Sequence, residues 1–211
     1  MEPSSDPRRR EIIEAGRRLA ERGLIVASQG NISVRADDGL LVTASGVSKG
    51  EMRDRHIIET DARGRSTKGG VSSEIPMHVA IYERRPDVRA VVHAHPPAAT
   101  AFAVAGLAPD AAVLAEAVLL LGHVPLVPYA APSTGDLAEA TGEVMRHAQV
   151  ALLANHGAVT VGSTLEQAMN RMETLEHLAR VTLMAKLLGE PRRLGADEVT
   201  RLLSLGTTSY R

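Results

Sequence analysis

Hydrophobic residues follow two different spacings along this chain of 211 residues. Apolar positions recur at helical spacing over residues 8–22, which Gly23 closes, and over residues 164–189, and both segments predict amphipathic helices. Between them, apolar and polar positions alternate in "NISVRA", and a second apolar run, "LLVTA", follows the turn "DDG". This pattern predicts a β-hairpin over residues 31–44 and a third strand at "HIIETD" (56–61).

The rest of the chain continues to mix strands with helices. We expect strands at 87–95 and 124–129, two strand-like runs in 150–162 broken at "NHG", and helices at 72–85, 97–121 (in pieces, broken near 106–109), 133–148 and 196–204. Ser73, and either Ser133 or Thr134, are the expected helix N-caps. Because strands and helices do not alternate strictly, we expect an α/β fold, a three-layer α/β/α sandwich around a largely antiparallel central sheet, rather than a doubly wound parallel one. No linker or repeat divides the sequence, so we expect a single domain over residues 1–211.

The composition narrows the possible functions. The sequence has four aromatic residues, Phe102, Tyr82, Tyr129 and Tyr210, and a net charge of −1. Stacking on bases needs exposed rings, and nucleic acids or anionic membranes attract a basic surface, so we expect neither as a partner. The absence of cysteine excludes thiolate zinc sites. A polar N-terminus and the lack of a run near ~20 apolar residues lead us to expect a soluble cytoplasmic protein.

Three histidines are the strongest chemical signal in the sequence. His93 and His95 stand one residue apart in "VVHAHP", so their side chains would project from the same face of a strand. His156 lies at the end of another apolar run, in "LLANHGAV". Three neutral imidazoles suit Zn²⁺ or a similar ion and leave a coordination position open, as catalytic sites do. The alternative is three unrelated polar histidines.

A helix start and two glycine-rich loops add to this signal. Glu74 falls in the first turn of the predicted helix over 72–85, where a glutamate often only compensates the helix dipole. His78 would share its face, although a surface or core-edge histidine is the simpler interpretation. The loops "SQGNIS" (28–33) and "TASGVSKG" (43–50), with the serines at 72–73, offer the amides and hydroxyls that bind phosphate. Turn chemistry alone could also explain each loop.

Taken in order, these motifs resemble a known family. "GNIS", "TASG", "SSEIPMH", "VVHAHP", "VPYA" and "ANHG" are similar in order and spacing to the class II aldolase/adducin head family, over about residues 8–190. Within it, the sequence looks most like the members that cleave L-fuculose 1-phosphate. The resemblance implies a homotetramer with active sites at subunit interfaces. It also implies zinc on His93, His95 and His156, with Glu74 as a movable fourth ligand and acid/base, and a substrate phosphate on Gly30, Asn31, Ser45, Gly46, Ser72 and Ser73.

The reaction implied by the resemblance is aldol cleavage. A ketose 1-phosphate would be split to dihydroxyacetone phosphate and an aldehyde through a metal-stabilised enediolate, with Zn²⁺, or another divalent ion such as Co²⁺ or Mn²⁺, as cofactor. The same fold and metal site also serve sugar-phosphate dehydratases, 4-epimerases and decarboxylases, which remain alternatives. Lys49 lies in a predicted phosphate loop, where its charge rather than nucleophilic attack would matter. A third interpretation is a non-catalytic scaffold like the adducin head.

Two positions bear on the choice between these reactions. Family aldolases have a tyrosine near the start of the segment matching 113–121, whereas this sequence has Glu116 there, as the dehydratase and epimerase relatives do. Glu116 is therefore a candidate catalytic residue, with a surface carboxylate as the alternative. Tyr210, next to the last residue, resembles the C-terminal tyrosine that family aldolases bring over the active site, and it is a second candidate.

Overall fold

The computed structural model describes the backbone of residues 6–209 and the side chains of residues 6–204. Its strands are β1 (Asn31–Arg35), β2 (Leu40–Thr43), β3 (Ile57–Thr60), β4 (Ala90–Ala94), β5 (Leu126–Val127), β6 (Val150–Leu153) and β7 (Gly157–Gly162). Its α-helices are α1 (Pro7–Glu21), α2 (Ile75–Arg84), α3 (Pro97–Val104), α4 (Ala115–Leu120), α5 (Gly135–Val144), α6 (Leu165–Leu188) and α7 (Ala196–Ser209). Three short 3-10 helices, η1 (Lys49–Glu51), η2 (Asp54–His56) and η3 (Ala111–Val113), complete the described elements.

The strands form one sheet in the order β3-β2-β1-β4-β7-β6-β5. Every neighbouring pair is antiparallel except β5 and β6, which run parallel. The predicted α/β fold with a largely antiparallel sheet is therefore confirmed. The hairpin of β1 and β2 and the consecutive pair β6 and β7 are local, whereas β1–β4 and β4–β7 join segments far apart in the sequence.

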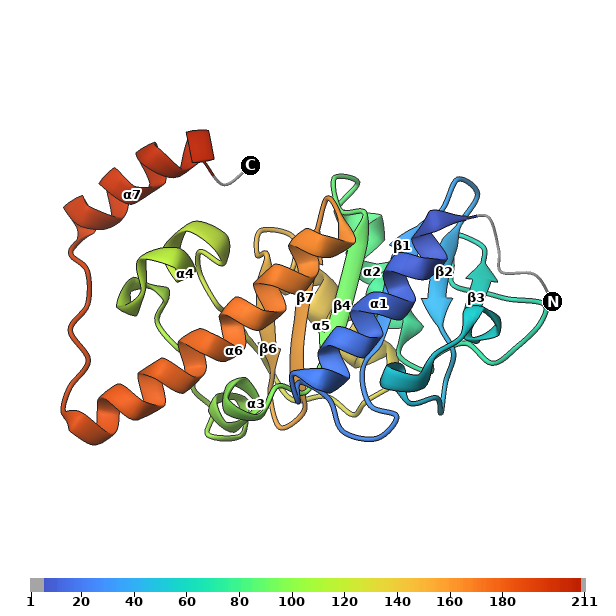
Figure 1. The fold of residues 1–211 in the computed structure, drawn as a ribbon, viewed down its shortest axis with the longest axis horizontal. Coiled ribbons are helices and arrows are strands. Elements are labelled where there is room, and N and C mark those ends of the chain that lie inside the picture. The colour runs from blue at the N-terminus through green and yellow to red at the C-terminus, as the bar shows by residue number, and fades with distance from the viewer. Residues whose placement is uncertain (1–5, 210–211) are drawn as a thin grey trace.

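Helices cover both faces of the sheet, which gives the three layers (Figure 1). One hydrophobic core joins the sheet to α1, α3, α4 and α6, and a second joins its other face to α2 and α5. Strand β4 divides its residues between the two: Val92 belongs to the first core and Val91 to the second. Because side chains alternate along a strand, His93 points to the side of α2 and α5.

The helices differ from the sequence prediction mainly at their ends. Helix α2 begins at Ile75 with Glu74 as its N-cap residue, so Ser73 is not the cap. Thr134 caps α5 through its side chain, which decides between the two expected caps. Helix α7 extends to Ser209, beyond the predicted end at 204. Within the described residues, no helix has the length and hydrophobicity needed to cross a membrane.

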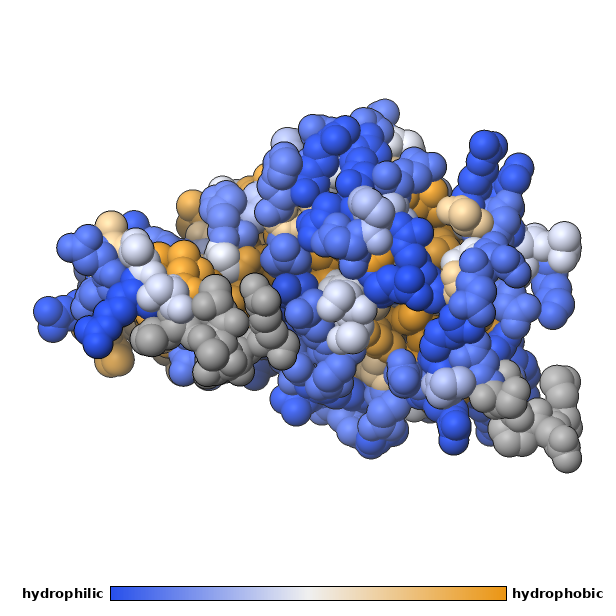
Figure 2. All heavy atoms as spheres, turned by 90° about the horizontal axis from the view of Figure 1, so that it is seen from above, coloured by the Kyte–Doolittle hydropathy of each residue, from blue (hydrophilic) through white to orange (hydrophobic). Residues whose placement is uncertain are grey.

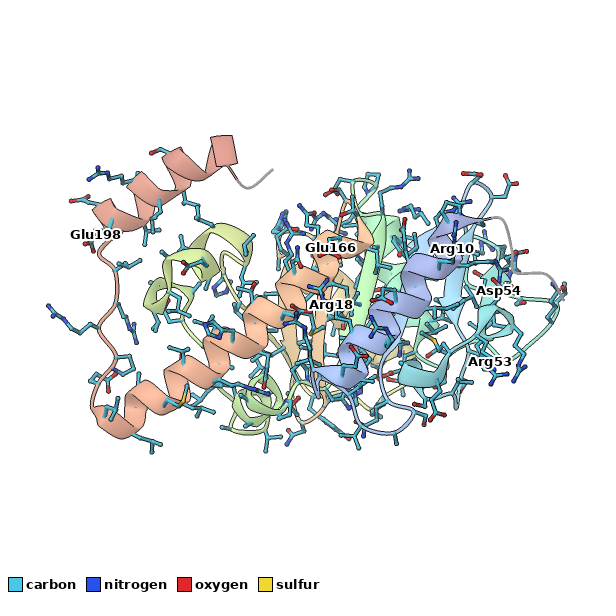
Figure 3. All side chains as sticks on the ribbon, in the orientation of Figure 1. Arg10, Arg18, Arg53, Asp54, Glu166 and Glu198 are labelled. Atoms are coloured by element: carbon cyan, nitrogen blue, oxygen red, sulfur yellow. The ribbon has the colours of Figure 1, made fainter. Side chains whose placement is uncertain are left out.

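Arg18 joins the first helix to the long helix α6, and Arg22 at the end of α1 adds an ion pair with Glu173 of α6 at 3.1 Å. Arg18 of α1 donates to Glu166 at 2.9 Å and to Asn170 at 2.8 Å, and it also pairs with Glu173. Figure 3 shows Arg18 and Glu166 pointing toward one another across the two helices. Helix α1 is thereby held against α6 over the face of the sheet that lies opposite α2.

A buried carboxylate anchors the helix that follows the histidine strand. Glu176 of α6, only 3% exposed, accepts hydrogen bonds from the backbone amides of Ala98 (2.9 Å) and Ala99 (3.0 Å). These amides belong to the first turn of α3, where no residue within the helix can accept from them. Pro96, the N-cap residue of α3, has no side chain able to do so. Glu176 therefore fixes the chain immediately after His95.

The Glu176→Ala variant is expected to lower the free energy of unfolding by about 1–3 kcal/mol, because it leaves buried amides without an acceptor. Urea denaturation followed by circular dichroism measures the change. Glu190→Ala, a substitution of an exposed glutamate beyond α6, is the matched control, with an expected change within about 0.5 kcal/mol. Equal stabilities of the two variants would contradict the anchoring role.

Candidate active site

Two neighbouring strands carry the buried polar residues at the base of the site. Asn31 of β1 pairs directly with His93 of β4, so both side chains lie on the sheet face that α2 covers. Asn31 is 3% exposed and His93 is fully buried. Gly30, just before Asn31, has a φ of +71°, and a Cβ there would lie 2.7 Å from the His93 carbonyl oxygen. A glycine is therefore required for β1 to start this close to the histidine strand.

The three predicted histidines lie together. The imidazole centroids of His93, His95 and His156 are 4.8–4.9 Å apart, and one ring nitrogen from each lies within 4.8 Å of the others. His93 Nδ1 is 2.9 Å from the Ala158 carbonyl oxygen, to which it donates. This leaves His93 Nε2 with a free lone pair 3.0 Å from His95 Nε2. His156 comes from the turn between β6 and β7, where Asn155 has a positive φ of 56°.

Glu74 completes the cluster from the opposite side. Its Oε2 accepts from Asn31 Nδ2 at 2.9 Å and lies 3.2 Å from His93 Nε2, while its Oε1 is 3.3 Å from His156 Nε2. Glu74 reaches this position because it stands at the N-cap of α2, directly above the sheet face that holds Asn31 and His93.

The electrostatics of the cluster favour neutral His95 and His156 and an ionised Glu74. Burial, with the neighbouring His93, lowers the pKa of His95 to about 3 and that of His156 to about 4. Burial raises the pKa of Glu74, but its contacts with His93 and His156 and the hydrogen bond from Asn31 outweigh burial and hold that pKa at about 2. Neutral imidazoles and a carboxylate are the forms that ligate a metal.

These residues fit a divalent cation. His93 Nε2 lies 3.0 Å from His95 Nε2, so a proton on His95 or a shared cation satisfies the His93 lone pair. The buried Glu74 Oε1 has no hydrogen-bond partner among the described residues, although it points at His156. Three imidazoles and one carboxylate without any thiolate match the ligand preferences of zinc and of similar first-row ions.

A second buried polar group lies behind the cluster: it consists of His78, which the sequence places on the face of Glu74, and of Ser33 and Tyr82, which the sequence analysis did not single out. His78 is fully buried, and its Nδ1 is 2.7 Å from Ser33 Oγ, so it is not at the helix surface or the core edge. The Tyr82 hydroxyl lies 2.9 Å from the same Ser33 Oγ and donates to the Ser33 carbonyl at 3.0 Å. Glu74, His78 and Tyr82 recur every four residues, and Asn31 and Ser33 alternate along β1. These two periodicities could have indicated that one polar helix face meets one polar strand face.

The segments predicted to bind phosphate are brought together around Glu74. The Ser45 amide donates to the Gly70 carbonyl at 2.8 Å, and Ala44 forms a β-bridge with Val71, which sets the loop after β2 beside the chain that leads into α2. Gly46 has a φ of +69° in that loop.

The two serines before Glu74 make local contacts. Ser72 is buried, and its Oγ accepts from the Glu74 amide at 3.4 Å. Ser73 Oγ accepts from Ser133 Oγ at 2.9 Å, on the exposed side of the same segment. Gly30 and Asn31 approach from the other side, where Asn31 binds Glu74. Asn31, Ser72 and Ser73 therefore lie next to Glu74 at the start of α2, and Ser45 lies beside Gly70 in the segment that leads into this helix.

The two remaining candidates are not part of this cluster. Glu116 is exposed in the first turn of α4, and among the described residues no hydrogen bond or ion pair joins it to the histidines or to Glu74. Tyr210 lies outside the residues that the structure describes.

Comparison with known proteins identifies the family. The Class II Aldolase and Adducin N-terminal domain family matches residues 10–183, so the chain belongs to the class II aldolase/adducin family. It is 35% identical to the 5-methylthioribulose-1-phosphate/5-deoxyribulose-1-phosphate aldolase of Rhodospirillum rubrum, over 92% of this chain and 89% of that one. It is 34% identical to the 3-oxo-tetronate 4-phosphate decarboxylase of Pectobacterium atrosepticum, over 94% of both. A solved L-fuculose 1-phosphate aldolase superposes with a TM-score of 0.88 at 29% identity, over 97% of this chain and 98% of that one.

Proposed function

We propose that this chain is a zinc-dependent aldolase that cleaves a ketose 1-phosphate to dihydroxyacetone phosphate and an aldehyde. The observation that carries the proposal is the convergence of three imidazoles and the Glu74 carboxylate on one point beside the Gly/Ser loops. The names of similar proteins include L-fuculose 1-phosphate and 5-deoxyribulose 1-phosphate, and both belong to the substrate class proposed here. Co²⁺ or Mn²⁺ could serve in place of zinc, and a cytoplasmic location is part of the same proposal.

Each group of residues has a separate task in this chemistry. A divalent ion held by His93, His95 and His156 would supply the Lewis acidity that stabilises negative charge on substrate oxygens. Glu74 is ionised and hydrogen-bonded to Asn31. It would deliver the proton that the carbon of the dihydroxyacetone phosphate half needs after its bond to the aldehyde carbon breaks. The hydroxyls and amides of the loops around 30–31, 45–46 and 72–73 would hold the phosphate and so fix the sugar chain beside Glu74.

We also propose a homotetramer whose active sites lie at subunit interfaces. Exposed apolar side chains support an interface, because Leu187 and Leu188 at the end of α6 are 87% and 92% exposed and Val104 at the end of α3 is 58% exposed. Figure 2 shows hydrophobic surface among hydrophilic residues at the end of the molecule that carries α7. The exposed Glu116 would then act in the site of a neighbouring subunit. Sedimentation equilibrium should give four chains per particle, and a monomeric mass would contradict the arrangement.

The runner-up function keeps the metal and phosphate sites but changes the reaction to dehydration, 4-epimerisation or decarboxylation. It is favoured by Glu116, an acid where family aldolases have a tyrosine, and by the likeness to a 3-oxo-tetronate 4-phosphate decarboxylase. The test is a panel of ketose 1-phosphates and four-carbon 3-oxo acid phosphates incubated with the zinc-loaded protein. Release of dihydroxyacetone phosphate supports the aldolase, whereas loss of water, epimerisation or release of CO₂ without it supports the runner-up.

Glu116→Gln is expected to lower kcat for aldol cleavage by roughly 100-fold, the usual contribution of a general acid or base, while the zinc content stays unchanged. Glu190→Gln, a substitution of another exposed glutamate, is the control and should leave kcat as it is. If Glu116→Gln retains full aldol cleavage, Glu116 has no part in the mechanism and is a surface carboxylate.

A further inference from the structure

Lys49 is a lysine whose side chain is almost entirely enclosed by the protein. It begins η1 and is 2% exposed, although lysine is among the residues that are least often buried. Helix α1 covers it through close packing on η1. A Cβ added at Gly16 of α1 would lie 2.6 Å from the Lys49 carbonyl oxygen, and one at Gly50 would lie 2.9 Å from Ala20 Cβ. The two glycines therefore allow α1 to press onto η1 and to exclude solvent from Lys49.

The buried ammonium group binds two backbone carbonyls. Lys49 Nζ donates to the Ser28 carbonyl oxygen at 2.9 Å and to the Val47 carbonyl oxygen at 2.8 Å. Within residues 6–204, no carboxylate lies at ion-pair distance from it, and Glu74 is the acid whose charge favours its protonated form. A buried cation normally has a charged partner, because desolvation of an unpaired charge is costly.

The two carbonyls belong to the two loops that flank the site. Ser28 stands two residues before Gly30 and Val47 follows Gly46 directly, so the ammonium joins the loop before β1 to the loop after β2. Both glycines have positive φ angles, of 71° and 69°. Gly30 and the adjoining Asn31 at the first loop, and Ser45 and Gly46 in the second, are among the residues proposed to hold phosphate. Lys49 thus lies behind the junction of the two loops.

We propose that Lys49 is a positioning residue for the substrate phosphate. It fixes the two loops around the anion and supplies a positive charge, which none of the six residues proposed to hold phosphate carries. This inference rests on the proposed function, because it assumes that the two loops bind phosphate. Burial lowers the pKa of Lys49 to about 8, so most of the ammonium is still protonated at neutral pH. A phosphate dianion nearby would favour the charged form further.

The test compares direct binding of inorganic phosphate to the zinc-loaded wild type and to Lys49→Met and Lys49→Gln, by isothermal titration calorimetry. Lys49→Met removes both the charge and the donors, and Lys49→Gln keeps a donor without the charge. Either change is expected to raise the phosphate Kd about tenfold or more, since it leaves buried carbonyls and the anion without a charged donor. Lys186→Met on α6, the same substitution away from the loops, should leave the Kd unchanged, and all variants should hold the same amount of zinc.

The outcomes separate this inference from the proposed function. If the wild type does not bind phosphate, the proposed phosphate site is wrong and the inference falls with it. If the wild type binds phosphate but either Lys49 variant that folds binds it equally well, only the role of Lys49 is wrong. Steady-state kinetics with a ketose phosphate that the protein cleaves give a second readout. If Lys49 positions the phosphate, its substitution raises KM more than it lowers kcat. If Lys49 is purely structural, its substitution changes stability but neither KM nor kcat.

One measurement needs no variant and so remains decisive if the substitutions prevent folding. The chain has three lysines, Lys49, Lys68 and Lys186, so their side-chain ammonium signals can be assigned in a ¹⁵N-labelled sample. Adding inorganic phosphate should shift the Lys49 signal and leave the other two in place. Phosphate binding that leaves the Lys49 signal unmoved would overturn the proposal.

Discussion

His93→Ala is expected to cost the protein its divalent metal and with it all measurable lyase activity. His93 is the fully buried member of the cluster, and its Nδ1–H is already committed to the Ala158 carbonyl, so Nε2 is presented in one orientation. Removal of a residue that is hydrogen-bonded to a metal ligand typically lowers metal affinity 10- to 100-fold. Removal of a ligand itself should therefore lower metal affinity about 100-fold or more. Zinc content after dialysis, measured by plasma mass spectrometry, gives the result directly.

His147→Ala is the control for this substitution. His147 is exposed near the end of α5 and takes no part in the cluster, so the variant should retain the metal of the wild type. Circular dichroism must show that both variants are folded. A folded His93→Ala protein that holds as much zinc as His147→Ala would mean that the three histidines do not form the metal site.

Glu74→Gln is expected to lower kcat by roughly 100- to 10,000-fold, the range for loss of a general acid or base, while zinc and inorganic phosphate still bind. The amide keeps the size of the side chain, and its oxygen can still accept from Asn31, but it cannot take up a proton. The three histidines and the Gly/Ser loops are untouched. Metal content, phosphate affinity and single-turnover rates together distinguish a chemical defect from a binding defect.

Glu83→Gln is the matched control on the same helix. Glu83 is exposed on α2, one turn beyond the buried His78, and the substitution should leave kcat unchanged. If Glu74→Gln instead loses zinc to the same extent as His93→Ala, the carboxylate is needed chiefly as a ligand. If it retains full activity, Glu74 has no role as acid or base.

Periodicity within single elements could be read from the sequence, and contacts between distant elements could not. Alternation along β4 places His93 and His95 on one side, and the pattern of strands and helices predicted the sheet and its layers. That His156 lies beside them depends on the pairing of β4 with β7, and the closeness of Asn31 depends on the pairing of β1 with β4. Both pairings join segments separated by more than 50 residues, so no local pattern specifies them.

The burial of two residues could not be predicted, because it depends on tertiary contacts. Lys49 looked like a loop lysine, and only the packing of α1 on η1 makes it a buried cation that joins two loops. For His78 a surface or core-edge position was the simpler interpretation, because its spacing from Glu74 and Tyr82 shows a polar helix face but not that Ser33 of β1 packs against it. Sequence spacing alone does not show that His156 lies beside His93 and His95. The resemblance of the ordered motifs to a known family is what predicted that these histidines share one metal site.

The most direct test is the formation of dihydroxyacetone phosphate from a ketose 1-phosphate by protein that is first stripped of metal with a chelator and then reloaded with zinc. We expect no product from the stripped protein, and product formation restored by about one zinc ion per chain, as expected for a single site made of three imidazoles. Product formation that continues undiminished after complete metal removal, or its absence with every substrate in the panel after reloading, would contradict a metal-dependent aldolase.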